Sequence, residues 1–329
     1  METNQKPSKN YCVLASRKNM SNEEWLQLRK NYLNISEVSA ALNLNPFKSA
    51  MALWAAKTGV YEEPYADNRF CEWGRIMEPV LLDYYAKQYD CQIKTVPYIL
   101  QSVEYRYICG NIDAVAIYPD GKKKIIEVKT TASVNEAEWK DGGCPIYYYI
   151  QIMLYEWITG VHEGQLICLI GGNDFRVVDV PYNQAVVDSL LAQCEIFWNR
   201  VANNIPLPPI DKDNSLLGKL YPTSKENVVQ LEAEFSEKLQ QLEALKQKES
   251  EIKAAKNVIE AEIKQAMTDN EMAVVGDWKV TWKSSSRSAF SAEEAKKYLT
   301  PEQIEACTHT SSVRTMRIGK NKKKSAAKK

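Results

Sequence analysis

Apolar and polar positions follow two different periods along the first two thirds of the chain. Between residues 22 and 203, segments with apolar residues at helical spacing alternate with short segments of strand-like alternation. This mixture predicts a domain of the α/β class. We place the domain at residues 1–205, because the sequence NNIPLPPIDKDNS then interrupts all periodicity and predicts a Pro-rich linker over residues 206–223.

A long helical pattern follows the predicted linker. Residues 224–270 contain no glycine or proline and repeat apolar residues in heptads. Val228, Phe235, Leu242 and Ile263 occupy one core position, and Leu231, Leu245, Ile252, Ile259 and Ala266 occupy the other. Lys238, Glu249 and Lys256 interrupt the seam, so a bent helix or a hairpin of two helices fits as well as one rod. A structural or oligomerising coil is the favoured role.

The rest of the chain is predicted to form a small strand-rich unit over residues 271–319. The segment MAVVGDWKVTWKS alternates like a hairpin, SAEEAKKYLTPEQIEACT contains a short helix, and SSVRTMRIG reads as another strand. Residues 320–329 form a basic tail, which would add salt-sensitive affinity for phosphates beside a nuclease.

One predicted hairpin, GNIDAVAIYPDGKKKIIEVKTT, carries candidate chemistry. A type I turn at YPDG with a left-handed glycine places Val115 opposite Ile125 and Asp113 opposite Glu127. Lys129 lies one step further along the face that carries Glu127. Directly opposed residues lie about 5 Å apart, so the two carboxylates should meet at the open end of the hairpin.

Two like charges on a partly buried face repel each other unless a cation lies between them. Oxygen ligands of this kind select hard ions, and Mg²⁺ typically takes one or two carboxylates together with water and substrate phosphate. The hairpin therefore predicts a site for Mg²⁺ or Mn²⁺ with Lys129 beside it. For IIEVKT taken alone, an ordinary solvent-facing strand is the stronger alternative.

Composition narrows the function only a little. The formal net charge is zero, which removes the simplest argument for a nucleic-acid partner, and only two histidines are present. The eight cysteines stand singly, without the close pairs of a zinc site. No run of about 18 apolar residues and no signal-peptide pattern occurs, so we expect a cytoplasmic protein without a membrane partner.

Asp113 followed by Glu127-Val128-Lys129 resembles the PD-(D/E)xK motif of nucleases with the restriction-endonuclease-like fold. Three further blocks, EEWLQLRKNYLNISEVSAALNLNPFKSAMALWAAKTG, RFCEWGRIMEPVLLDYYAKQY and YYYIQIMLYEWITG, resemble the YqaJ viral recombinase family, relatives of phage lambda exonuclease. The resemblance covers about residues 20 to 200. It implies a mixed central sheet flanked by helices, to which the long helix and the strand-rich unit are a C-terminal extension.

The resemblance also implies an activity and partners. Such enzymes are Mg²⁺-dependent exonucleases that degrade one strand of linear double-stranded DNA from its 5′ end, leaving 3′ overhangs for a single-strand annealing protein. The lambda relatives imply a homo-oligomer, with a trimer as one form. Two alternatives stay open: an endonuclease or nickase on the same core, and a non-catalytic scaffold that binds DNA ends.

Roles for individual residues follow from the same resemblance. Asp113, Glu127 and the carbonyl of Val128 would hold metal, with Lys129 orienting the attacking water or stabilising developing charge. Glu78 matches a further metal ligand, although its place before Pro79 also suits the first turn of a helix.

The resemblance assigns Arg29, Ser36 and Tyr155 to the binding of DNA and its 5′ phosphate, and Gln151 to the catalytic residues. Arg29 and Ser36 match positions that receive the terminal 5′ phosphate. Gln151 would lie near the metal, and Tyr155, four residues on, shares its helix face. The bulky NYLNIS and the residue Asn111 depart from the family pattern, which leaves the polarity of digestion open.

Overall fold

The structure is a computed structural model that describes residues 10–61, 69–309 and 314–318. The chain forms two compact units, Met1–Tyr221 and Pro222–Lys329. Within the described ranges, no helix has both the length and the apolar content to cross a membrane.

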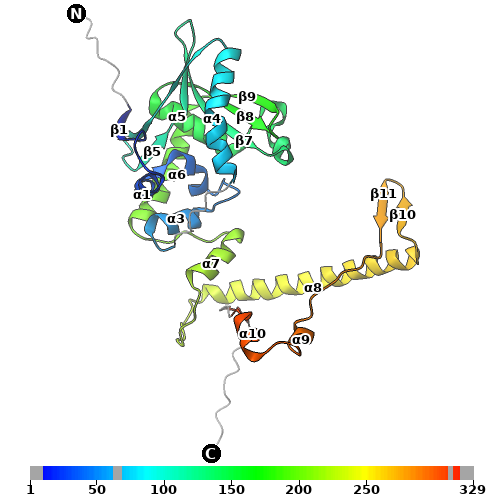
Figure 1. Ribbon diagram of the computed structural model, residues 1–329. Coiled ribbons are helices and arrows are strands. Elements are labelled where there is room, and N and C mark those ends of the chain that lie inside the picture. Colours follow the sequence, from blue (N-terminus) through cyan, green and yellow to red (C-terminus); the bar gives the residue numbers. More distant parts are fainter. Residues whose placement is uncertain (1–9, 62–68, 310–313, 319–329) are drawn as a thin grey trace, which may run out of the picture. The chain divides into compact units, whose positions relative to one another are not determined.

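A five-stranded mixed sheet forms the core of the first unit (Figure 1). Its strand order is β3 (Gln92–Thr95), β6 (Ala114–Ile117), β7 (Lys123–Thr131), β8 (Glu163–Ile170) and β9 (Asp174–Pro181). β7 and β8 run parallel, whereas the other neighbours are antiparallel. The predicted mixed sheet is confirmed, and β7 is its middle strand.

The predicted register of the β6–β7 hairpin is also confirmed. Val115 pairs with Ile125 and Ala114 with Ile126. The N–H of Gly121 donates to the carbonyl of Tyr118 at 2.9 Å, and Gly121 has a φ of 86°. That left-handed conformation is cheap only for glycine, so the turn residue sets the pairing of the two strands.

Helices cover both faces of this sheet. On one face, α4 (Arg69–Gln88) contributes Leu81, Leu82 and Tyr85 to an apolar cluster with β6, β7 and β8. On the other face, α5 (Ile146–Thr159) packs against the sheet, with α6 (Gln184–Ala202) and α3 (Ala50–Thr58) beyond it. α4 continues through Pro79, so Glu78 lies inside the helix rather than in its first turn.

A second sheet is formed by four strands from the first 111 residues, and the last of these strands along the chain is followed closely by β6 of the first sheet. Its strands are ordered β1 (Tyr11–Ser16), β4 (Tyr98–Ser102), β5 (Ile108–Asn111) and β2 (Leu33–Asn34). Between β1 and β2 lies α1 (Asn22–Lys30), and β2 is followed by the 3₁₀ helix η1 (Ile35–Glu37) and α2 (Val38–Ala41). Only Ile112 and Asp113 separate β5 from β6, which places Asp113 at the junction of the two sheets.

The predicted linker is not an open connection. It includes the 3₁₀ helix η3 (Asp211–Asp213) and α7 (Asn214–Leu220), and the first unit extends to Tyr221. Asp213 and Leu216 are buried, and the hydroxyl of Ser49 donates to Asp213. Long-range packing therefore orders this Pro-rich segment, which local composition predicted to be a spacer.

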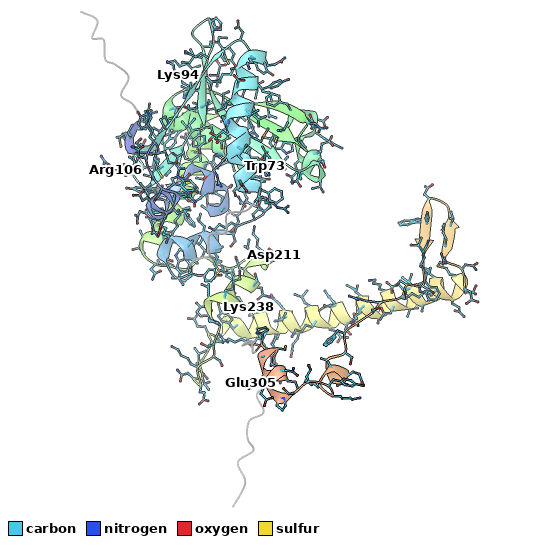
Figure 2. The ribbon with its side chains drawn as sticks, viewed as in Figure 1. Trp73, Lys94, Arg106, Asp211, Lys238 and Glu305 are labelled. Carbon is cyan, nitrogen blue, oxygen red and sulfur yellow. The ribbon has the colours of Figure 1, made fainter. Side chains whose placement is uncertain are left out.

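The second unit is built around one long helix, α8 (Glu234–Met267), which Figure 1 shows without a break. The alternatives of a bent helix and a helical hairpin are therefore wrong. The helix begins ten residues after the predicted start at residue 224, and Val228 and Leu231 lie outside it. Most side chains along α8, including Lys238 (Figure 2), are exposed.

The remaining elements of the chain are short. β10 (Met272–Val275) and β11 (Trp278–Thr281) form the expected hairpin, and the expected short helix is divided into α9 (Ala292–Ala295) and α10 (Pro301–Ala306). In the first unit, the 3₁₀ segment η2 (Ser133–Gly142) follows β7. Residues 314–318 form no strand, and the rest of the last predicted strand and the basic tail lie outside the described residues.

Candidate active site

Asp113 is tied to the neighbouring strand by a backbone contact. Its Oδ2 accepts a hydrogen bond from the N–H of Val128, on β7, at 2.9 Å. Asp113 stands one residue before the Ala114–Ile126 pair, so the register brings it beside Glu127. Burial raises the pKa of Asp113, whereas Lys129 and the Val128 N–H oppose that rise.

Glu127 is 2% exposed and lies at the centre of the candidate site. Its Oε1 accepts hydrogen bonds from Lys129 Nζ at 2.5 Å and from Gln151 Nε2 at 2.6 Å. Its Oε2 is buried and has no hydrogen-bond partner among the described residues. Burial and the charge of Asp113 raise the pKa of Glu127 to about 8, so this carboxyl is costly to ionise without another cation.

Lys129 remains a cation in this setting. Burial alone would lower its pKa, but Glu127 and Asp113 raise the pKa of the Lys129 ammonium above its ordinary value. The ammonium also lies 5.1 Å from the centre of the Tyr148 ring. The structure therefore brings the three residues of the predicted motif together as a group of two carboxylates and one lysine, in which Glu127 is buried and Asp113 and Lys129 are partly exposed.

Glu78, on α4, is close enough to this group for the charges of Asp113 and Lys129 to shift its pKa. Burial and then Asp113 raise the pKa of Glu78 to about 7, whereas Lys129 and Arg17 lower it. Nevertheless, in the described parts of the chain no three His, Cys, Asp or Glu side chains are arranged together to hold a metal ion. The carbonyl of Val128 stays a predicted ligand.

A divalent ion fits the chemistry of the two central carboxylates. Mg²⁺ accepts one or two carboxylate ligands and takes its other oxygens from water and substrate. The buried Oε2 of Glu127 lacks a partner, and such an atom costs about 1–3 kcal/mol unless something satisfies it. Asp113 and Glu127 thus form an acceptor-rich pair that suits a hard cation.

Gln151 and Tyr155 support Glu127 from α5. Gln151 Nε2, besides its contact with Glu127, lies 3.1 Å from the Tyr155 hydroxyl. Tyr155 is only 2% exposed, and its predicted role in DNA binding stays a prediction. Gly110 permits this packing, because a Cβ there would lie 2.8 Å from the Tyr155 ring and 2.9 Å from Ile35.

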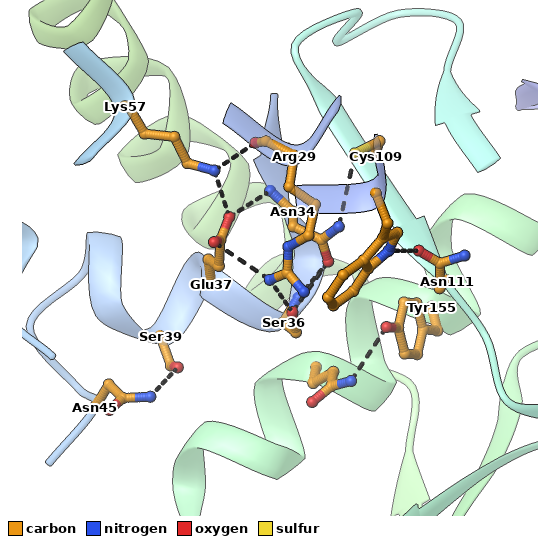
Figure 3. A network of polar contacts seen from close by, with 12 residues as sticks. Arg29, Asn34, Ser36, Glu37, Ser39, Asn45, Lys57, Cys109, Asn111 and Tyr155 are labelled. Carbon is orange, nitrogen blue, oxygen red and sulfur yellow. Dashed lines mark hydrogen bonds and ion pairs between the residues drawn. The ribbon is translucent and has the colours of Figure 1, made fainter. Parts of the chain in front are cut away.

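Arg29 and Ser36, the predicted phosphate ligands, contact each other in a second polar cluster (Figure 3). Arg29 Nη2 donates to Ser36 Oγ at 3.2 Å and pairs with Glu37 at 3.2 Å. Lys57 Nζ contacts Glu37 at 2.6 Å. Although burial raises the pKa of Glu37, Arg29 and Lys57 lower it to about 2. With two cations around one anion, the cluster keeps a positive charge.

Sequence reasoning did not find Arg17 or Trp25, which link the two clusters. The Cζ atoms of Arg17 and Arg29 lie 4.5 and 4.4 Å from the centre of the Trp25 ring. Trp25 Nε1 donates to Asn111 Oδ1 at 3.4 Å, close to the Asp113 junction. Arg17 Nη1 is buried and has no hydrogen-bond partner in the described residues, which suits an anionic ligand.

A cavity of about 870 Å³ opens beside the Arg29 cluster. Its volume falls within the range of about 300–1,000 Å³ that is usual for ligand pockets. Cations outnumber anions in its lining: Arg29, Lys30, Lys48, Lys57, Lys212 and Lys219 face Glu23, Glu37 and Asp213. Trp25, Phe47 and Tyr61 add aromatic surface. Cations and aromatic rings together suit a nucleotide or a DNA strand.

Comparisons with known proteins identify a matching family domain and a sequence relative. Residues 24–162 match the YqaJ-like viral recombinase domain. The uncharacterised protein YqaJ of Bacillus subtilis (strain 168) is 28% identical over 282 residues, which cover 84% of this chain and 88% of that protein.

Solved structures with low sequence identity also match. The alkaline exonuclease LHK-Exo from Laribacter hongkongensis is 16% identical, with 60% of this chain and 100% of that chain covered and a TM-score of 0.46. A phage-related exonuclease from Haemophilus somnus 129PT is 13% identical, with 55% and 98% covered and a TM-score of 0.40. The match of residues 24–162 to the YqaJ-like viral recombinase domain and the similarity to YqaJ confirm the predicted resemblance to the YqaJ-type viral recombinase family.

Proposed function

We propose that this protein is a Mg²⁺-dependent deoxyribonuclease that removes nucleotides from the 5′ end of one strand of linear double-stranded DNA. One observation carries the proposal: the buried, unpartnered Oε2 of Glu127 stands beside Asp113 and Lys129 within a viral recombinase domain. The products would be nucleoside 5′-monophosphates and a duplex with a 3′ overhang.

Each residue of the site has a task in this reaction. Asp113 and Glu127 would hold Mg²⁺, or Mn²⁺ in its place, with Glu78 and the Val128 carbonyl as further ligands. When bound, the metal supplies an activated water and stabilises charge on the phosphate. The Lys129 ammonium stabilises the negative charge that develops on phosphate oxygens, and Gln151 fixes the orientation of Glu127.

The polar cluster around Arg29 would bind the end of the DNA. Arg29 and Ser36 would donate hydrogen bonds to the terminal 5′ phosphate, and the buried Nη1 of Arg17 offers another donor beside them. A single-strand annealing protein would take up the 3′ overhang. Whether the enzyme works as a homo-oligomer such as a trimer stays a prediction.

Digestion of defined DNA substrates tests the proposal. Linear duplexes with a 5′ phosphate or a 5′ hydroxyl, and a relaxed circle, are incubated with Mg²⁺ or with EDTA. We expect loss of the linear duplexes in Mg²⁺ only, faster with the 5′ phosphate, and an intact circle.

Two variants of the hairpin complete the experiment. Asp113→Asn should abolish hydrolysis, whereas Asp120→Asn, in the exposed turn of the same hairpin, should digest DNA like the wild type. Nicks in the circle would instead indicate an endonuclease. DNA binding with equal, negligible hydrolysis by the wild type and Asp113→Asn would indicate a non-catalytic scaffold.

A further inference from the structure

α8 exposes a stripe of large apolar side chains along its whole length. The exposed fraction is 37% for Phe235, 61% for Leu245, 69% for Ile252 and 57% for Ile259. Leu245, Ile252 and Ile259 are seven residues apart at one heptad core position, and Phe235 occupies the other, so these residues follow one side of the helix with the slow drift of a coiled-coil seam. Met267, at the end, is the only residue of the helix that is fully buried. The stripe is thus an apolar surface that the described chain leaves uncovered.

The ends of α8 make a second copy of the same helix a matching partner. If two copies lie antiparallel and overlap fully, Glu234 of one copy lies opposite the partner's Met267. Over about 51 Å, every residue at one core position then faces a residue at the other core position, as antiparallel coiled coils require. Phe235 faces the partner's Ala266, and Leu242 faces the partner's Ile259.

Two of the three polar residues that interrupt the stripe, Glu249 and Lys256, also fit this arrangement. Glu249 lies opposite the partner's Ile252, one helical turn from the partner's Lys256, so opposite charges meet on both sides of the two-fold axis. A parallel pair in register would instead set Glu249 against Glu249 and Lys256 against Lys256. Like charges at such positions select against the parallel pair.

We propose that α8 is a dimerisation helix that pairs with α8 of a second copy of this chain in an antiparallel coiled coil. The apolar stripe supplies the contact area, and Glu249 and Lys256 select the direction of pairing. The dimer is independent of the proposed nuclease activity, because none of its residues belongs to the candidate active site.

The mass of the full-length protein in solution, measured by sedimentation equilibrium, tests dimerisation. We expect a dimer at micromolar concentration, and Ile252→Asp should convert it to a monomer by placing a charge in the seam. Circular dichroism of the whole chain checks that the variant is still folded. A wild-type monomer, or an oligomer whose mass Ile252→Asp leaves unchanged, would overturn the proposal.

Charge reversals test the direction of pairing. Glu249→Lys should weaken the dimer about tenfold at low salt, because it turns two attractive contacts into two repulsive ones. Lys256→Glu should do the same, with circular dichroism as a check because Lys256 also pairs with Glu260 in its own helix at 3.4 Å. The double variant should restore dimerisation.

The matched control is Glu251→Lys, which makes the same reversal away from the stripe and should dimerise like the wild type. In a parallel dimer each reversal would exchange one like-charged pair for another and leave the affinity unchanged. That result would overturn the antiparallel arrangement even if the protein is a dimer.

Discussion

Glu127 combines two opposing influences on a single carboxyl group. Lys129 and Gln151 donate hydrogen bonds to Oε1, whereas Oε2 has no partner among the described residues. Burial and the charge of Asp113 raise the pKa of Glu127 to about 8. A group in this state gains from any additional positive charge close to Oε2. The same property makes the residue a poor element of an inert core and a good ligand for a cation.

Replacement of Lys129 should impair the proposed hydrolysis more than the fold. Lys129→Gln removes the ammonium that would stabilise charge on the phosphate, so we expect the rate of DNA hydrolysis to fall at least about 100-fold. The rate of nucleotide release from a linear duplex measures it. Lys123→Gln, on the same strand but exposed, is the control, and equal rates for both variants would contradict the role.

The buried carboxyl of Glu156 should make the free energy of unfolding depend on pH. It is fully buried, both its oxygens lack hydrogen-bond partners in the described residues, and burial and Glu163 raise its pKa from 4.5 to about 8. The folded state therefore binds more protons than the unfolded state between these values. Its contribution to stability is complete below about pH 4.5 and is lost as the pH rises through about 8.

Glu156→Gln removes this titration. Relative to the wild type, the variant should gain stability between about pH 5 and pH 8.5, by at most about 5 kcal/mol. Urea denaturation at both pH values measures the difference. Glu104→Gln, at an exposed carboxyl, should show no such gain, and a parallel pH profile for Glu156→Gln and wild type would refute the prediction.

At the scale of elements, close contact between β5 and α5 positions the candidate site. Gly110 on β5 touches the Tyr155 ring, and Tyr155 contacts Gln151, which in turn holds Glu127. The space at Gly110 is too small for a Cβ, so the glycine allows Tyr155, and with it α5, to pack closely against β5. The orientation of the Glu127 carboxyl on β7 therefore depends on Gly110, which lies on β5 of the other sheet.

Gly110→Ala should disturb this packing. Its Cβ would lie under 3.0 Å from both Tyr155 and Ile35, so we expect a loss of about 1–3 kcal/mol in the free energy of unfolding, typical of an overpacked core. Chemical denaturation measures it. Gly218→Ala, where a Cβ meets nothing within 4 Å, is the control and should be neutral or stabilising.

Elements governed by local chemistry were predictable from the sequence, and those governed by distant contacts were not. The hairpin register followed from one glycine turn, and α8 followed from its heptads. In contrast, α4 continues through Pro79, and α7 is ordered by packing against residues far away in sequence. Arg17 escaped notice for the same reason, because only the fold brings it to Trp25.

At the scale of the whole molecule, the chain consists of a first unit that contains the candidate active site and a second unit built around α8. The division falls after Tyr221, within the predicted linker of residues 206–223, and Leu216 and Asp213 are buried in the first unit. The second unit buries little of its own surface, and the proposed dimer would cover the main apolar part of it. Each unit would thus have a separate role.

Two truncations test this division. A chain that ends at Tyr221 should unfold with the free energy of the first unit in the full protein and should not form the dimer proposed for α8. A chain that ends at Ile205 loses the buried Leu216 and the Ser49–Asp213 bond, so it should be at least about 2 kcal/mol less stable. Equal stability of the two in urea would show that α7 contributes nothing.

The hydrogen bond from the Val128 N–H to Asp113 supplies a reporter of the site that needs no substrate. An amide proton held in this way exchanges with deuterated solvent only when the bond opens. Slow exchange at Val128 in an inactive Asp113→Asn variant would mean that the hairpin is intact and only its chemistry is lost. Rapid exchange in Asp113→Ala would mark a loosened hairpin, so the Val128 amide separates a broken structure from a disabled reaction.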